Sequence, residues 1–239
     1  YFHPDHLWML QRAGVPTGLL CTETPYDQAE EGRVLRFCAA GWTNERSSVA
    51  YLRQYTPHVW YLPHAYDPAR HYARQDHADV DLPAHDVVFV GTGFAERVEL
   101  LTGVDWAGLG IDLGLYGNWD LPRGNALRPF VRSGPIPNQQ AAALYRRAAI
   151  GLNLYRRSKG FGPDAPRIDH AVSLNPRALE LAACGVFTLS DARAEVEEVF
   201  GDAVPTFTTP AELASLVTYC LAHPSARAFQ AGRLPRLVA

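Results

Sequence analysis

The chain has 239 residues, of which 47% are hydrophobic and 20% are charged, with a net charge of −3. This balance is typical of an ordinary globular protein and excludes a small domain that depends on disulfides for stability. No run approaches the roughly 18 apolar residues of a membrane span, and no signal peptide is visible. The four cysteines have no metal-site spacing, so we expect buried free thiols and a cytoplasmic location.

Basic residues are unevenly distributed. Residues 121–177 contain ten Arg or Lys and two Asp, whereas the rest of the chain is acidic. This local excess is consistent either with an anionic ligand on one face or with a solvated arginine-rich surface.

Short apolar runs alternate with amphipathic stretches along the chain. In chain order, strands are predicted at 17–21, 39–43, 59–62, 86–91, 112–116, 130–133, 150–154, 186–190 and 205–207. Helices are predicted at 4–13, 28–37, 47–55, 95–102, 138–148, 176–183, 195–200, 210–222 and 225–232. Such alternation predicts an α/β fold with parallel sheets. The segment 160–170 is predicted to be a mobile loop.

A His/Asp/Ala/Pro-rich stretch at 64–86 lacks apolar periodicity and predicts a domain boundary. We therefore expect one domain at 1–80 and a second at 81–239. Because the first has only three predicted strands, it is expected to be an incomplete Rossmann-like unit.

The first phosphate-binding signal is Gly91-Thr92-Gly93, between a predicted strand and a predicted helix. Glycines there allow close approach of a phosphate, and the helix start offers N–H groups. Glu96 replaces the third glycine of the dinucleotide pattern, so a nucleoside diphosphate is favoured over NAD. Arg97 lies one helical step on and could reach a phosphate, or could pair with an acid on the surface.

The second signal is Ser173-Leu174-Asn175-Pro176-Arg177-Ala178-Leu179-Glu180, which reads as a helix start. Asn175 is a favoured N-cap, and proline suits the first helical position. Arg177 could grip a diphosphate, and Glu180, on the same helix face, could accept ribose hydroxyls. The alternative is an exposed Arg177–Glu180 ion pair.

With these residues in view, the chain resembles the group 1 glycosyltransferases, most closely their CgeB-like, spore-maturation branch. The most specific match is Leu174-Asn175-Pro176-Arg177-Ala178-Leu179-Glu180 with Ala183-Cys184-Gly185. Further matches are Thr22-Glu23-Thr24-Pro25-Tyr26-Asp27, Trp42-Thr43-Asn44-Glu45, Tyr61-Leu62-Pro63-His64, Phe89-Val90-Gly91-Thr92-Gly93 and Gly151-Leu152-Asn153-Leu154.

The resemblance implies the GT-B fold, with two Rossmann-like units facing a cleft, and sugar transfer without a metal or other cofactor. It places Gly91, Gly93, Arg97 and Arg177 at the diphosphate of a donor, UDP type favoured, and Glu180 at the ribose. It also implies donor contacts near Thr92, Tyr116, Gly134, Ile136, Pro137, Asn153, Ser173, Leu174, Asn175 and Pro176. Val172 stands where many relatives carry a second glutamate, so the sugar and the stereochemical outcome are left open.

The predicted reaction is hexosyl transfer from a nucleoside-diphosphate sugar to a hydroxyl acceptor. Arg97 and Arg177 are expected to stabilise the leaving diphosphate, and Glu23, His64 and His170 are the candidate acid/base residues. The alternatives are a nucleotide-sugar-binding subunit that needs a partner, an NAD-type oxidoreductase, and a basic surface for a polyanionic acceptor such as DNA. The acceptor itself is left open as a glycan, a protein or a small molecule.

Overall fold

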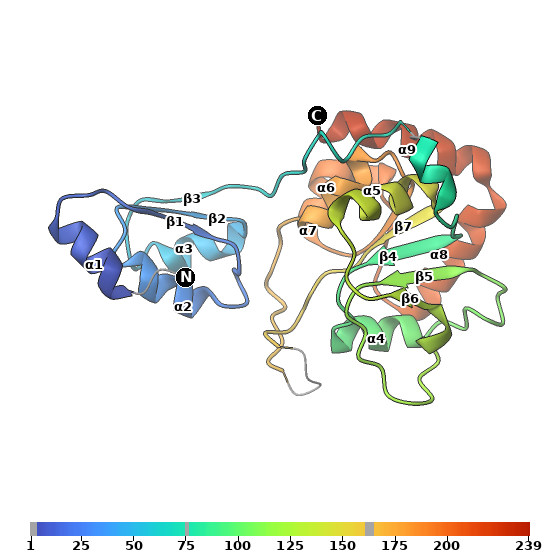
Figure 1. Ribbon diagram of the computed structural model, residues 1–239, viewed down its shortest axis with the longest axis horizontal. Coiled ribbons are helices and arrows are strands. Elements are labelled where there is room, and N and C mark those ends of the chain that lie inside the picture. Colours follow the sequence, from blue (N-terminus) through green and yellow to red (C-terminus); the bar gives the residue numbers. More distant parts are fainter. Residues whose placement is uncertain (1–3, 75–76, 161–164) are drawn as a thin grey trace. The chain divides into compact units, whose positions relative to one another are not determined.

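The computed structural model describes residues 4–74, 77–160 and 165–239 of the chain (Figure 1). Residues 161–164 of the predicted 160–170 loop lie outside this part. The described residues form two compact units. Unit 1 contains residues 4–64, 157–160 and 165–174, and unit 2 contains residues 65–74, 77–156 and 175–239.

Unit 1 is built on a parallel three-stranded sheet. Its strands are β1 (Gly18–Cys21), β2 (Ala40–Thr43) and β3 (Val59–Tyr61), in the order β1-β2-β3. Its helices are α1 (Pro4–Arg12), α2 (Gln28–Leu35), the 3₁₀ turn η1 (Arg46–Ser48) and α3 (Val49–Leu52). Cys21, Leu35, Leu52 and Val59 are fully buried between helices and sheet.

Unit 2 is built on a parallel six-stranded sheet in the order β6-β5-β4-β7-β8-β9. The strands are β4 (Val87–Val90), β5 (Leu113–Tyr116), β6 (Val131–Ser133), β7 (Ile150–Asn153), β8 (Thr188–Asp191) and β9 (Thr206–Phe207). The chain builds the sheet from β4 outward to β6, then returns to add β7, β8 and β9 on the other side. In a sheet of this order, ligands bind at the carboxyl ends of the two strands where the direction reverses. Here those strands are β4 and β7.

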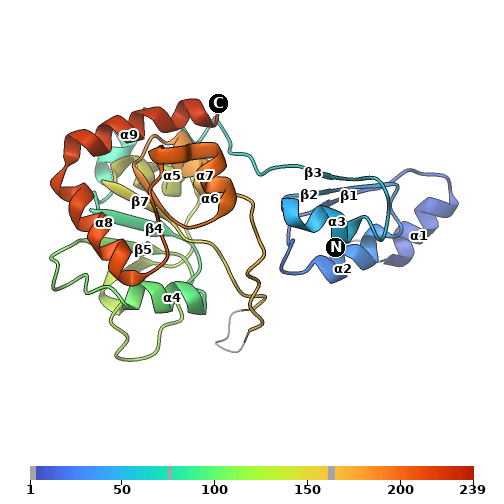
Figure 2. The ribbon, with the colours of Figure 1, turned by 180° about the vertical axis from the view of Figure 1, so that it is seen from behind.

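The helices of unit 2 cover both faces of this sheet (Figures 1 and 2). They are α4 (Ala95–Thr102), α5 (Asn138–Arg147), α6 (Pro176–Ala183), α7 (Ala194–Phe200), α8 (Pro210–Ala222) and α9 (Pro224–Leu237), with 3₁₀ turns η2 (His77–Asp81), η3 (Arg128–Phe130) and η4 (Gly201–Ala203).

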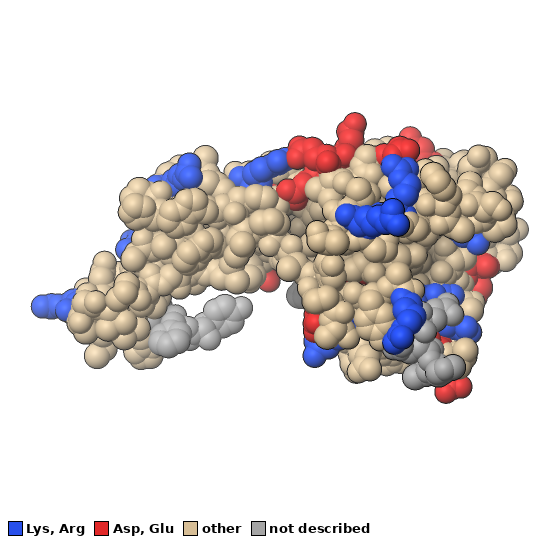
Figure 3. Space-filling model, turned by 90° about the horizontal axis from the view of Figure 1, so that it is seen from above, with Lys and Arg blue, Asp and Glu red and all other residues tan. Residues whose placement is uncertain are grey.

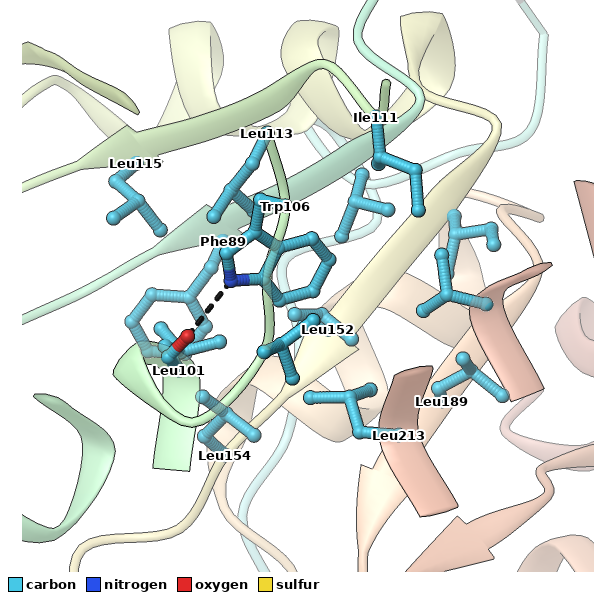
Figure 4. Packing of buried hydrophobic residues seen from close by; sticks show 14 of the residues in the cluster. Phe89, Leu101, Trp106, Ile111, Leu113, Leu115, Leu152, Leu154, Leu189 and Leu213 are labelled. Atoms are coloured by element: carbon cyan, nitrogen blue, oxygen red, sulfur yellow. Dashed lines mark hydrogen bonds between the residues drawn. The ribbon is translucent and has the colours of Figure 1, made fainter. Parts of the chain in front are cut away.

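Successive strand residues face opposite sides, and both sides are apolar. Val87 and Phe89 pack with residues of α4 and α8 in one cluster, which also holds Trp106. Figure 4 shows this cluster, with the Trp106 indole donating to the Leu101 carbonyl at 2.8 Å. Val88 packs with residues of α5 and α6 in a second cluster. Both faces are therefore buried, as expected of a parallel sheet covered by helices.

All nine predicted strands and nine predicted helices are present, with small differences at their ends. The predicted helix at 47–55 is split into η1 and α3, which ends at Leu52. The predicted helix at 225–232 is longer than expected, because α9 continues past Gly232 to Leu237. Its extension buries Leu234 completely, so packing outweighs the weak helix propensity of Gly232.

The segment after β3 belongs to unit 2, so the units divide at His64/Ala65 and not near residue 80. A buried ion pair accounts for this difference. Arg146 of α5 donates to both carboxylate oxygens of Asp79 in η2, at 2.6 and 3.0 Å, and also to the Arg70 carbonyl at 3.2 Å. A stretch without apolar periodicity is thus fixed to unit 2 by polar contacts.

Part of the basic excess of 121–177 is used in ion pairs within unit 2. Arg146 is buried against Asp79, and Arg132 pairs with Asp112 at 2.5 Å. On the face drawn in Figure 3, basic side chains lie in separate groups among acidic and uncharged ones. All four cysteines are buried and free, as predicted. In the described part of the chain, no helix has the length and apolar character to cross a membrane.

Candidate functional site

The loop after β4 lies where the sheet order reverses. Gly91 N donates to the Tyr116 carbonyl at 2.8 Å, and Gly93 N donates to the Asn118 carbonyl at 2.8 Å. A Cβ on Gly91 would collide with the guanidinium of Arg177, and a Cβ on Gly93 would collide with the Trp119 ring. Glycine at both positions therefore lets Arg177 and Trp119 approach the backbone closely, and a side chain at either position would force its neighbour to shift.

Arg177, in the first turn of α6, reaches the carboxyl ends of both β4 and β7. Its Nε donates to the Val90 carbonyl at 2.7 Å, and its Nη1 donates to the Leu154 carbonyl at 3.2 Å. The guanidinium carbon lies 4.5 Å from the centre of the Phe89 ring. Hydrogen bonds and the aromatic ring thus fix the cation at the point where the strand order reverses.

Arg97, in the first turn of α4, converges on the same place. It is 6% exposed and donates to the Leu154 carbonyl at 2.7 Å and to the Thr92 carbonyl at 2.9 Å. Its guanidinium carbon lies 5.3 Å from the Phe89 ring centre. Arg97 and Arg177 therefore share one carbonyl and one ring, which gives a local concentration of positive charge. We call Gly91, Gly93, Arg97 and Arg177 the switch-point cluster.

The start of α6 adds a further feature suited to an anion. Asn175 is the N-cap, as predicted, and its side chain accepts from Ala178 N at 3.0 Å, while Pro176 occupies the first turn. The amino end of a helix carries a partial positive charge. Arg177 lies in this same turn, so the helix dipole and a guanidinium act in one place.

Glu180 lies on α6 one turn after Arg177, with its side chain 20% exposed. Its Oε1 is 4.0 Å from Nε2 of His71, a buried residue of the segment after β3. Tyr145 of α5 is buried close to Arg177 and Glu180. Burial raises the pKa of Tyr145, and the Arg177 guanidinium opposes that increase, so the phenol is neutral at physiological pH.

Two other predicted donor residues have internal partners. Tyr116 is 5% exposed, and its hydroxyl bonds Nε2 of His85 at 2.8 Å. Asn153 is fully buried in β7, and its amide donates to Ser190 Oγ in β8 at 3.0 Å. Both side chains are therefore held by partners within unit 2. The turn that contains Gly134, Ile136 and Pro137 is on the surface, apart from half-buried Ile136, which packs against the second core cluster.

Ser173 and Leu174 belong to unit 1 and are buried there. Ser173 N donates to the Glu45 carboxylate at 3.1 Å. Ser173 thus contacts unit 1, whereas Asn175 begins the helix of unit 2.

The three candidate acid/base residues all belong to unit 1. Glu23 is exposed after β1, and His170 is exposed within residues 165–174. His64 is half-buried, and its Nε2 lies in hydrogen-bond contact with the Asn44 amide nitrogen. That nitrogen also donates to the Thr22 carbonyl at 3.1 Å, so the amide nitrogen faces His64 and the imidazole Nε2 accepts.

The sequence contains one Asp-x-Asp segment, Asp79-Val80-Asp81. The carboxylate of Asp79 is 4% exposed and is held by Arg146, so this segment serves an internal ion pair. Among the described residues, no group of three or more His, Cys, Asp or Glu side chains is placed to hold a metal ion.

Sequence reasoning missed Phe89, His71, Tyr145 and Glu45. Phe89 looked like an ordinary core residue of a strand, and nothing local indicated that two arginines stack on it. His71 and Tyr145 are brought to α6 by packing between segments far apart in the chain. Only the recurrence of the Trp42-Thr43-Asn44-Glu45 segment in a family pattern pointed towards Glu45.

A family model described as glycosyl transferase-like matches residues 95–235, more than half of the chain. No curated protein matches. Sucrose-phosphate synthase from Thermosynechococcus elongatus is 19% identical with a TM-score of 0.60, covering 88% of this chain. The chain spans 56% of the length of that synthase.

Two further solved structures share the fold. Anabaena Alr3699/HepE, in complex with UDP-glucose, is 12% identical with a TM-score of 0.66, over 99% of this chain and 72% of that one. An alpha-glucosyltransferase in complex with UDP-glucose and DNA containing an abasic site is 9% identical with a TM-score of 0.63, over 98% of this chain and 72% of that one. The predicted α/β fold with two parallel-sheet units of the GT-B kind is confirmed.

Proposed function

We propose that this chain, which belongs to the glycosyl transferase-like family, binds a nucleoside-diphosphate sugar and transfers the sugar to a hydroxyl acceptor. One observation carries the proposal: Arg97 and Arg177 converge on the Leu154 carbonyl beside the amino end of α6. Two fixed cations and a helix start form a suitable site for a diphosphate. A donor of the UDP type is favoured because HepE was solved with UDP-glucose.

In the proposed reaction, the bond between the sugar anomeric carbon and the diphosphate oxygen breaks, and a bond to the acceptor oxygen forms. The electron pair leaves with the diphosphate, where Arg97, Arg177 and the α6 dipole offset the developing charge without a metal. A preorganised donor of this kind contributes on the order of 3 kcal/mol. The acceptor proton passes to a base, for which Glu23, His64 and His170 are the candidates.

Glu180 is proposed to accept the ribose hydroxyls. It lies one helical turn beyond Arg177 on the same face, so a single nucleotide could contact both side chains. We also propose membership of the CgeB-like branch, on the strength of the segment Asn175-Pro176-Arg177 with Glu180 and Cys184-Gly185. Four free, buried thiols support a cytoplasmic location.

Thermal-shift and calorimetric titration with UDP, GDP, ADP and TDP tests donor binding. We expect UDP to raise the unfolding temperature; a ligand at 100 times its dissociation constant adds about 2.7 kcal/mol. Arg177→Ala and Glu180→Ala should each weaken binding by about tenfold or more, as expected for loss of a charge-assisted contact. Wild-type affinity in both variants would refute the assigned site.

A nucleotide-sugar-binding subunit without its own activity is the second candidate. It predicts UDP-sugar binding with neither hydrolysis nor transfer when the chain is assayed alone. A polyanionic acceptor, such as the DNA named for one neighbour, predicts affinity for that polymer that falls steeply with salt.

A further inference from the structure

Glu45 follows strand β2 in unit 1 and has no part in the proposed chemistry. Its side chain carries a carboxylate, yet the residue is only 2% exposed. Burying such a group is unfavourable unless its oxygens receive hydrogen bonds. The role of Glu45 therefore follows from the groups that donate to it.

The Glu45 carboxylate accepts from two distant parts of the chain. Ser47 donates to Oε1 from N at 2.9 Å and from Oγ at 2.8 Å. Val172 N, 127 positions further along, donates to both oxygens at 3.2 Å, and Ser173 N donates to Oε2 at 3.1 Å. The Ser173 hydroxyl lies 3.4 Å from Oε1 and accepts from Arg46 N at 2.9 Å. One side chain thus holds two consecutive backbone N–H groups at 172 and 173.

These donors are all neutral N–H or O–H groups, so the site needs a group that only accepts. An ionised carboxylate meets this need, with two oxygens and about four lone-pair positions. A carboxamide of the same shape does not, because its NH₂ would face other donors. Replacing Glu45 by glutamine therefore tests the hydrogen bonds with little change in volume.

The anchored residues lie directly before α6. Ser173 is two positions before the N-cap Asn175, and Leu174 between them is 7% exposed. Arg177 follows two positions after the N-cap. The chain therefore runs directly from the anchored backbone at 172–173 into the turn that carries Arg177.

We propose that Glu45 is a positioning residue for the nucleotide: it fixes the backbone of Val172 and Ser173 and so restrains the start of α6. It acts through this segment and contacts no atom of the donor. The inference rests on the proposed donor site at α6, and it assigns a role to Glu45, which the proposed function leaves unused.

The test compares Glu45→Gln with wild type by calorimetric titration with UDP and by backbone hydrogen exchange. We expect the dissociation constant for UDP to rise by about 10- to 100-fold, the size of effect that a small misplacement produces. Exchange at residues 172–178 should become faster, while exchange in β4 and β7 stays slow.

Glu212→Gln is the matched control. The Glu212 carboxylate also accepts from backbone N–H groups, those of Thr208 and Thr209, but at the start of α8. This variant makes the same chemical change and should bind UDP as wild type does. A purely structural role for Glu45 would lower the unfolding temperature of Glu45→Gln without changing the UDP affinity of its folded fraction, and that result would overturn the proposal.

If Glu45→Gln does not fold, Glu45→Asp replaces it, with a carboxylate that is one methylene shorter. Faster exchange at 172–178 and weaker UDP binding are expected again; unchanged exchange would overturn the anchoring role. Exchange is measured without nucleotide, so it tests the anchor even if wild type binds none of the four nucleotides. That failure would count against the proposed function alone.

Discussion

Glu31 shows how position in the fold alters the chemistry of one carboxyl group. It lies on α2 in unit 1, and one of its oxygens accepts from Glu23 N at 2.9 Å. Burial raises the pKa of Glu31 to about 7, and the hydrogen bond from Glu23 partly opposes this increase. The carboxyl group therefore changes charge near physiological pH, although a glutamate in solution is ionised there.

This raised pKa predicts that stability depends on pH. The folded state retains the proton up to about pH 7, whereas the unfolded chain loses it near pH 4.5, the ordinary value. Between these limits the folded state binds more protons, so stability falls as pH rises. Glu31→Gln should flatten this part of the profile and stabilise the protein at pH 8, as measured by urea unfolding at several pH values. A profile with the same slope in both proteins would contradict the assignment.

The contact between Asn44 and His64 predicts a tautomer. Because the amide nitrogen of Asn44 faces His64 Nε2, that nitrogen must accept, and a neutral ring carries its proton on Nδ1. Two-bond nitrogen–proton NMR spectra of the labelled protein should show the Nδ1–H form for His64. Asn44→Leu should release this preference, and a predominant Nε2–H form in wild type would refute the contact.

At the scale of elements, the sequence predicted strands and helices well because both faces of the unit 2 sheet are buried. Its central strand β4, for example, is a short apolar run (Val87–Val90) that stands out between polar turns. The signals for helix starts also lie in a few neighbouring residues: Asn175-Pro176 predicted the start of α6 correctly. What the sequence did not show were pairings across long separations, such as Glu45 with Val172 or Arg146 with Asp79. No periodicity or turn signal encodes these contacts.

The cap of α6 can be tested separately from its charge. Asn175→Ala removes the bond to Ala178 N and should cost about 1 kcal/mol of stability, measured by urea unfolding. It should also weaken UDP binding, because the first turn carries Arg177. Thr209→Ala, which removes the equivalent cap of α8, should cost a similar amount and leave UDP binding unchanged. Equal UDP affinities in the two variants would argue against a special role for the α6 start.

At the scale of the whole molecule, a buried ion pair joins two segments that are far apart in the sequence. The segment after β3 has little apolar character, yet it joins unit 2 through Asp79 and Arg146, both with side chains under 5% exposed. Removing one partner of a buried ion pair leaves the other charge uncompensated, at a cost of roughly 3–5 kcal/mol.

Asp79→Ala should therefore lower the free energy of unfolding by an amount in this range, measured by denaturant titration. Asp81→Ala changes the other acid of the same Asp-x-Asp segment, which is exposed, and should have little effect. The pair of variants also separates an ion-pair role from metal binding. Loss of UDP binding on addition of EDTA, or on Asp81→Ala, would favour a metal at this segment.

Unit 1 is assembled from stretches that are far apart in the sequence. Residues 157–160 and 165–174 belong to it, although they follow strands β4 to β7 of unit 2 in the chain. No single truncation therefore yields either unit intact. A fragment that starts at residue 65 would carry the backbone N–H groups of Val172 and Ser173 without the carboxylate that binds them. A fragment that ends at residue 64 would keep that carboxylate without its distant donors. Residues 1–64 and 65–239, expressed separately, should therefore be poorly soluble. When both fragments are expressed in the same cell, unit 1 can form from its separated stretches.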